Sequence, residues 1–150
     1  MCFGIFKPNP NPIPTPITDY VMITKQEYLY RLGLPAYNLD RPLDTLVSIT
    51  SKKNLDIIIS SLVYSADLYV ENICDCEDYA LQAQCDAAFK FHISGIRMAL
   101  GNMPLGYHGF NIALDTDNNI WLHDANAGFE YAGEWFKIGE NGYQPNCVFV

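Results

Sequence analysis

Residues 75–91 read DCEDYALQAQCDAAFKF, a stretch in which apolar side chains recur at helical spacing from Cys76 to about Phe91. Several of these positions are alanine, which allows close approach to a neighbouring element. The spacing predicts a tightly packed central helix that begins at Cys76. A thiol in the first turn of a helix lies beside unsatisfied backbone amides and the positive end of the helix dipole, both of which favour a thiolate.

The carboxylates of Asp75, Glu77 and Asp78 flank this thiol and oppose a thiolate by like-charge repulsion. Activation of Cys76 is therefore expected to need a base. His108, in the run YHGFN at 107–111, is the candidate base because it stands on a predicted strand beside a small residue.

Asp124 ends the next predicted strand, in the run WLHD at 121–124. If the two strands pair through the turn DTDNN at 115–119, His108 and Asp124 lie near one end of the pair, with the register open by a residue or two. Asp124 can then hold the second ring nitrogen of His108. Cys76, His108 and Asp124 are thus the predicted catalytic residues.

The rest of the chain divides into helices and then strands. Thr24 and Glu27 predict a capped helix that runs to Arg31, and the apolar spacing over 51–70 predicts an amphipathic helix. Strands are predicted over 96–100, 107–114 and 120–124, with candidate closing strands at 135–138 and 147–150. Helices first and strands second predict an α+β fold, with N-terminal helices packed on a mainly antiparallel sheet.

Length and composition predict one folded domain. The chain has 150 residues, of which 49% are hydrophobic and 17% are charged. Proline recurs in the run PNPNPIPTP at 8–16, which predicts an extended arm over 1–17 before a single domain over 18–150. The arm is expected to be a spacer, or alternatively a docking segment for a protein partner.

The net charge of -8 disfavours a nucleic-acid backbone or an anionic membrane as a partner, and favours neutral or cationic partners. No stretch approaches the ~18–20 apolar residues of a membrane span, and the first residues lack the apolar core of a signal peptide. The five cysteines form an odd set without a disulfide-framework spacing. We therefore expect a soluble, acidic, cytoplasmic protein without a membrane span.

The order of Cys76, His108 and Asp124, with the run Cys-x-Asp-Tyr-Ala at 76–80, resembles the transglutaminase-like superfamily. The sequence motif DCEDYA at 75–80 most resembles the bacterial transglutaminase-like cysteine proteinases. The resemblance implies a papain-like fold with Cys76 as nucleophile, His108 as general base and acid, and Asp124 as the orienting group. The chain departs from the family pattern at Gly109, where alanine is usual.

The function expected on these grounds is a thiol-dependent amide-bond hydrolase or acyltransferase that works through a thioester on Cys76. Peptidase, amidase and transglutaminase share these steps and stay open, with a peptide or protein amide as substrate and no cofactor or metal required. One alternative is an inactive papain-like fold that serves as a structural or binding module of a larger assembly. A second is a zinc module using Cys74, Cys76, Cys85 and either His92 or His108, although their spacing lacks the usual Cys-x2–4-Cys knuckle.

Overall fold

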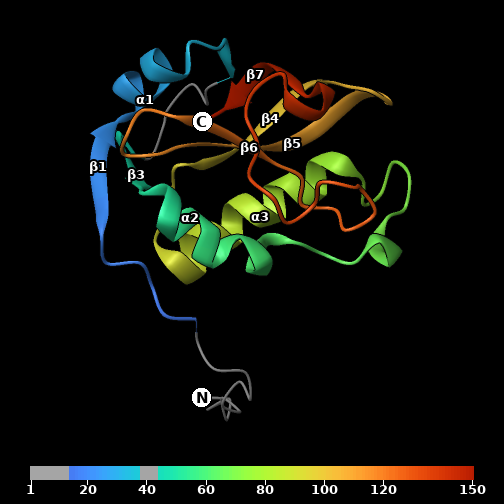
Figure 1. Cartoon of the computed structure of the whole chain (residues 1–150), viewed down its shortest axis with the longest axis horizontal. Helices are drawn as coiled ribbons and strands as arrows, with labels where there is room; N and C mark the ends of the chain where they lie inside the picture. Colours follow the sequence, from blue (N-terminus) through green and yellow to red (C-terminus); the bar gives the residue numbers. More distant parts are fainter. Residues whose placement is uncertain (1–13, 38–43) are drawn as a thin grey trace, which may run out of the picture.

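The computed structural model describes residues 14–37 and 44–150, so most of the predicted arm at 1–17 lies outside the described residues (Figure 1). Strands and α-helices are mixed up to residue 91, and strands with one short 3₁₀ turn follow. The strands and α-helices are β1 (Tyr20–Thr24), α1 (Lys25–Leu32), β2 (Ala36–Tyr37), β3 (Leu46–Thr50), α2 (Lys52–Ile58), α3 (Cys76–Phe91), β4 (Ile96–Met103), β5 (Gly106–Leu114), β6 (Ile120–His123) and β7 (Gln144–Phe149).

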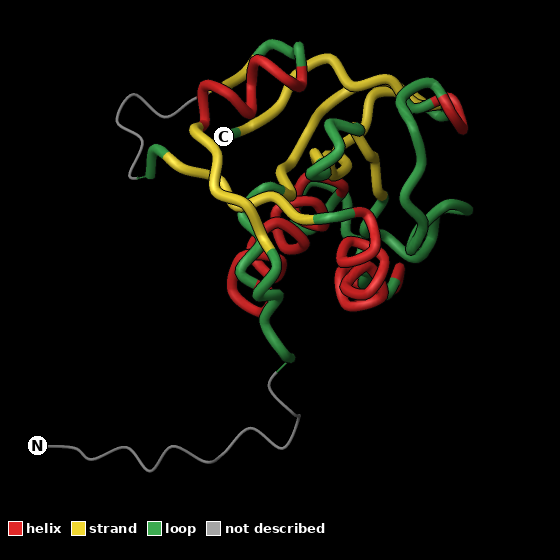
Figure 2. Tube along the Cα trace, turned by 60° about the vertical axis from the view of Figure 1, so that its left-hand side comes forward, coloured by secondary structure: helices red, strands yellow, loops and turns green. Residues whose placement is uncertain are grey.

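The main sheet has five strands in the order β2-β7-β4-β5-β6. All neighbours in this sheet are antiparallel except β2 and β7. A separate two-stranded sheet pairs β1 with β3 in antiparallel register. The rotated view shows α1 on one side of the strands and α2 and α3 on the opposite side (Figure 2).

Helix α3 follows the sequence prediction from its first residue to its last. It begins after Asp75, whose backbone N–H donates to Asp78 Oδ2 (3.1 Å), and it ends at His92 in the left-handed conformation (φ 61°). Its buried face packs with α2 and the inner side chains of the sheet. This core cluster includes Leu55, Ile58, Leu62, Tyr79, Ala83, Ala87, Phe91, Ile96 and Ala113.

A second core cluster lies between α1 and the other face of the sheet. Tyr28 and Leu32 of α1 are buried there against Phe110 and Ile112 of β5. The buried hydroxyl of Tyr28 donates to the carbonyl oxygen of Gly95 (2.9 Å), so its polar atom is satisfied. Alternate residues of β5 therefore serve two different cores.

The turn between β5 and β6 is the predicted hairpin, and Asp115 organises it. This fully buried carboxylate accepts hydrogen bonds from the backbone N–H groups of Asp117 (2.9 Å) and Asn119 (2.8 Å) and from Trp121 Nε1 (2.8 Å). Burial alone raises the pKa of Asp115, but these hydrogen bonds outweigh burial and the pKa is lowered.

Two predicted elements differ from the structure, and some strands of the structure were not predicted. The helix predicted over 51–70 is α2 followed by a 3₁₀ turn, Ile59–Leu62, because Val63 turns to an extended conformation. The segment 135–138 is not a strand, and only Phe136 bridges to Leu122. Strands β1 and β3 were not predicted, because they pair across an intervening helix and not through a hairpin.

The predicted order of helices first and strands second is therefore wrong. Strands hold more of the described residues than α-helices do, and β1, β2 and β3 lie in the half expected to be helical. The α+β, papain/transglutaminase-like architecture with N-terminal helices is thus contradicted by the element order, and the comparisons given below agree. Within the described residues, no helix is both long and apolar enough to cross a membrane.

Candidate functional site

Cys76 is the first residue of α3 and is partly exposed. Its thiol donates a hydrogen bond to Glu77 Oε2 at 3.3 Å. The carboxyl groups of Asp75 and Glu77 also interact: a hydrogen bond with Glu77 raises the pKa of Asp75, and the same bond lowers the pKa of Glu77. Two of the three carboxyl groups predicted to oppose the thiolate, those of Asp75 and Glu77, therefore lie close to the sulfur.

His108 on β5 and Asp124 after β6 meet as the sequence predicted. His108 Nε2 donates to Asp124 Oδ2 at 2.7 Å, and the two residues are only 6% and 1% exposed. The other oxygen of Asp124 accepts from the backbone N–H of Asn126 (3.0 Å). The His108 ring packs on Phe129, with 4.6 Å between ring centroids. Asp124 thus fixes one ring nitrogen and leaves Nδ1 free to act on a neighbour.

Asp124 and Cys76 both affect the pKa of His108. Burial lowers the pKa of a histidine, but the hydrogen bonds and charges of Asp124 and Cys76 outweigh burial and raise the pKa of His108 from 6.5 to about 9. His108 is therefore a cation at neutral pH. A cationic imidazolium therefore lies beside the Cys76 thiol.

Gly109 explains how β5 comes so close to the start of α3. A Cβ at this position would lie 3.0 Å from the backbone nitrogen of Glu77 and 3.2 Å from the carbonyl carbon of Cys76. Any larger residue has to push the helix start away from the strand. The glycine that departs from the expected family pattern is thus required by this contact.

Cys76 and His108 lie between two surface cavities and line both of them, together with Tyr107. One cavity of about 420 Å³ is completed by Ala66, Tyr69, Asn126, Gly128 and Phe129. The other, of about 410 Å³, is completed by Glu77, Met98, Leu100, Gly109 and Phe149. We call the two together the thiol groove. A ligand that spans it passes directly over the thiol.

The zinc ligand set is not assembled. Cys74 and Cys85 line a different cavity from Cys76, so the thiols do not converge. In the part of the chain that the structure describes, the only close group of potential ligating atoms is Asp75, Cys76 and Glu77. This group contains no second thiol and no imidazole, which zinc prefers.

Tyr143 is a site residue that sequence reasoning missed. Its buried hydroxyl donates to Asp124 Oδ2 at 2.9 Å, the same oxygen that binds His108. No sequence spacing links residue 143 to residue 124. Asn126 was also missed, but the run Asp124-Ala-Asn126-Ala-Gly128 carries a signal, because each acidic or amide side chain accepts from the backbone two residues on.

Comparison with known proteins finds the fold in lectin chains. The PSL1a–E64 complex matches with a TM-score of 0.58 and 14% sequence identity, over 86% of this chain and 51% of that chain. The Polyporus squamosus lectin bound to the human-type influenza-binding epitope Neu5Acα2-6Galβ1-4GlcNAc matches with a TM-score of 0.55 and 14% identity, over 86% of this chain and 49% of that chain. The chain thus spans about half the length of these lectin chains. No family model and no curated protein sequence matches it.

These findings correct the family expectation. The likeness to the transglutaminase-like superfamily and the papain-like fold is contradicted, because the two solved structures named above, which share this fold, are lectin chains and no family model matches. The expected amide-bond hydrolase or acyltransferase, and its peptide or protein amide substrate, are contradicted with it. A six-residue motif describes the start of one helix and does not determine a topology.

Proposed function

We propose that this chain is a ligand-binding module whose groove contains a reactive thiol, with Cys76 as nucleophile, His108 as its cationic partner and Asp124 as the group that orients His108. The observation that carries the proposal is the buried 2.7 Å hydrogen bond between His108 and Asp124. A buried, charge-assisted bond of this kind at a cavity wall is typical of a functional site.

The ligand we propose is a molecule that lies along the thiol groove and carries an electrophilic carbon. The thiolate sulfur of Cys76 attacks that carbon, a C–S bond forms, and the bond from carbon to its electronegative partner breaks. The imidazolium of His108 supplies a proton to the departing or opening group. The free Nδ1 of His108 is the nitrogen available for this role, because Nε2 is engaged by Asp124.

E64 is a suitable probe, because the PSL1a neighbour is a complex with E64 and because E64 is an epoxide that alkylates thiols. We expect intact-mass and peptide mapping to find one E64 adduct, on Cys76. The rate should fall at least about tenfold in His108→Gln and in Asp124→Asn, which lose the cation or its orienting partner. Cys85 is exposed and serves as the internal control for ordinary thiol reactivity.

Labelling of Cys76 no faster than that of Cys85, at every pH from 6 to 9, would overturn the reactive thiol. The His108→Gln variant must keep the circular-dichroism spectrum of the wild type for its rate to be compared. A site that needs a free thiol suits a reducing compartment, and we propose the cytoplasm on the strength of the unpaired cysteines.

A second candidate function is glycan binding, favoured by the glycan complex of the Polyporus squamosus lectin. The groove has two exposed aromatic rings, Tyr69 and Tyr107, which are 47% and 60% exposed. The side-chain amide of Asn126 keeps its NH₂ free, since its Oδ1 accepts from Gly128. Aromatic faces and amide donors are groups that can hold a neutral sugar ring.

Calorimetry with Neu5Acα2-6Galβ1-4GlcNAc and with Galβ1-4GlcNAc tests this candidate. We expect the neutral disaccharide to bind better, because Glu77 borders the groove and repels a sialic acid carboxylate. Binding should be lost in Tyr107→Ala. Absence of heat with both glycans contradicts glycan binding and leaves the E64 result to be judged separately.

A further inference from the structure

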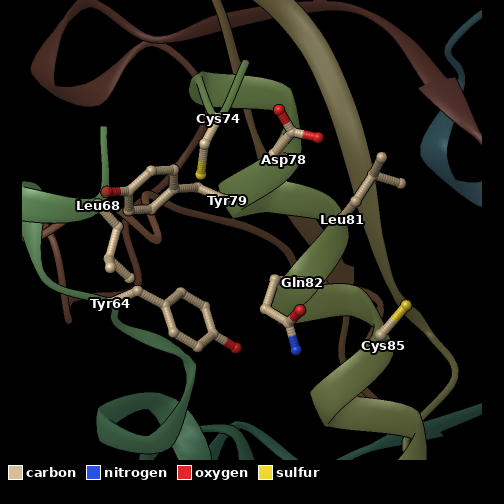
Figure 3. A pocket seen from close by; sticks show the side chains of 8 residues that line it. All are labelled: Tyr64, Leu68, Cys74, Asp78, Tyr79, Leu81, Gln82 and Cys85. Carbon is tan, nitrogen blue, oxygen red and sulfur yellow. The ribbon is translucent and has the colours of Figure 1, made fainter. Parts of the chain in front are cut away.

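A third cavity lies beside α3 and shares no lining residue with the thiol groove (Figure 3). We call it the α3 side pocket. It has a volume of about 350 Å³ and is lined by Tyr64, Leu68, Cys74, Asp78, Tyr79, Leu81, Gln82 and Cys85. This volume is in the range of cavities that hold small ligands.

Two tyrosine rings form one side of the α3 side pocket (Figure 3). Their centroids are 6.4 Å apart with 68° between the ring planes. Both hydroxyls are already used: Tyr64 donates to Asp86 Oδ2 (2.8 Å) and Tyr79 donates to the carbonyl oxygen of Ser65 (2.7 Å). Because both hydroxyl protons are engaged, these tyrosines can offer a ligand their ring surface, their π electrons and oxygens that only accept.

Two partly exposed leucines give the pocket apolar surface. Leu68 is 57% exposed and Leu81 is 39% exposed. Solvated leucines that border the same cavity lose this contact with water when an apolar group enters. The pocket thus favours a ligand with an aromatic or aliphatic body.

The polar groups left in the pocket are acceptors. Gln82 Nε2 donates to Asp86 Oδ1 (3.0 Å), so the carbonyl oxygen Oε1 is its free atom. One carboxylate oxygen of Asp78 accepts a hydrogen bond from the backbone N–H of Asp75 (3.1 Å). The other oxygen can accept a hydrogen bond from a ligand. Among the lining residues that the structure describes there is no Lys, Arg or His. A ligand must bring its own hydrogen-bond donors.

The chain around the pocket is negatively charged. Between Lys53 and Lys90 the sequence has no Lys or Arg. Its charged residues in this interval are Asp56, Asp67, Glu71, Asp75, Glu77, Asp78 and Asp86. Two of these carboxylates have a cation nearby, because Asp86 pairs with Lys90 (2.7 Å) and Asp56 pairs with Lys52 (2.5 Å). The field at the pocket therefore attracts cations.

We propose that the α3 side pocket binds a small organic cation, an ammonium group on an aromatic or short aliphatic body. The apolar body lies against Leu68 and Leu81. The ammonium group faces the tyrosine rings and donates to Gln82 Oε1 and Asp78. Cation–π attraction, hydrogen bonds to acceptors and the local negative charge all act in the same direction at this site.

The test uses phenethylammonium chloride as probe and 2-phenylethanol as its neutral analogue, in a Cys76→Ser background that removes the thiol of the groove. Cys74 lines the pocket, so the probe should slow its alkylation by iodoacetamide, followed by peptide mass spectrometry. We expect half-protection at a concentration about tenfold lower for the cation than for the alcohol. Cys147 is buried outside the pocket and reports any global unfolding.

Two variants carry the same added charge. Gln82→Lys puts an ammonium group into the pocket, whereas Phe89→Lys adds it to the same helix at a residue that is 86% exposed and does not line the pocket. Protection should be lost in Gln82→Lys and kept in Phe89→Lys. Equal protection by the cation and the alcohol overturns the preference for a cation, and no protection by either overturns the site. Because Cys76 is absent in every arm, the result is independent of the thiol groove.

Discussion

The hydroxyl of Tyr143 lies 2.9 Å from Asp124 Oδ2, and this oxygen also accepts the hydrogen bond from His108. One carboxylate oxygen therefore serves two buried donors from two different parts of the chain. The phenol is held edge-on to the His108 ring, with 6.2 Å between centroids. Tyr143 positions the orienting group and does not itself line the thiol groove.

Tyr143→Phe removes this hydroxyl and keeps the ring. We expect a loss of about 1–2 kcal/mol in the free energy of unfolding, because a buried hydrogen bond to a charged acceptor is lost. Urea denaturation of the variant and the wild type measures the difference. Retention of full stability would mean that the hydroxyl contributes nothing to the folded state.

Stability should depend on pH through His108. Its pKa rises from 6.5 to about 9 on folding, so its contribution is fully present below about pH 6.5 and is lost as the pH rises through 9. At about 1.4 kcal/mol per pKa unit, the contribution is on the order of 3 kcal/mol. Urea midpoints of the wild type should therefore fall between pH 6.5 and pH 9.5.

Asp124→Asn should weaken this pH dependence. Without the carboxylate, only Cys76 opposes the effect of burial, so the pKa of His108 should fall below about 9. Proton NMR titration of the histidine ring checks the direction. A pKa that stays near 9 in the variant would show that another group holds the imidazolium.

Gly109→Ala should slow E64 labelling of Cys76. The new Cβ meets the Glu77 backbone at 3.0 Å and moves the start of α3 away from β5, which separates the thiol from His108. We expect labelling to slow several-fold and the unfolding free energy to fall by about 1–3 kcal/mol. Labelling of Cys85 in the same sample should not change, and a parallel change there would indicate general loosening of the fold.

Glu77→Gln should have the opposite effect on Cys76. Glu77 accepts the thiol hydrogen bond at 3.3 Å and places a negative charge beside the sulfur. Neutralising it removes repulsion of the thiolate, so labelling should become faster near pH 7. The initial rate of adduct formation by mass spectrometry tests this. A slower rate would mean that Glu77 helps to position the thiol.

Local patterns predicted the central helix and the hairpin well. Helix α3 has both a regular apolar period and terminal residues that mark its ends, and the 115–119 turn has a carboxylate that binds its own backbone. These features depend on neighbouring residues only. His108 and Asp124 followed, because a hairpin brings residues on its two strands together.

Contacts between distant segments were not predictable in this way. The pairing of β1 with β3 joins Tyr20 to Thr50, and no local signal specifies such a partner. Tyr143 reaches Asp124 through tertiary packing for the same reason. The motif at 75–80 defined the surroundings of one thiol correctly but suggested a fold that the rest of the chain does not have.

The separation of the site residues along the chain has a consequence for synthesis. Cys76 emerges from the ribosome early, His108 and Asp124 follow, and Tyr143 comes last, just before β7. Domains acquire their packed structure only when their distant segments are available. A nascent chain that still lacks Tyr143 therefore has no phenol to hold Asp124, and the arrangement of Cys76, His108 and Asp124 is completed only when residue 143 has emerged.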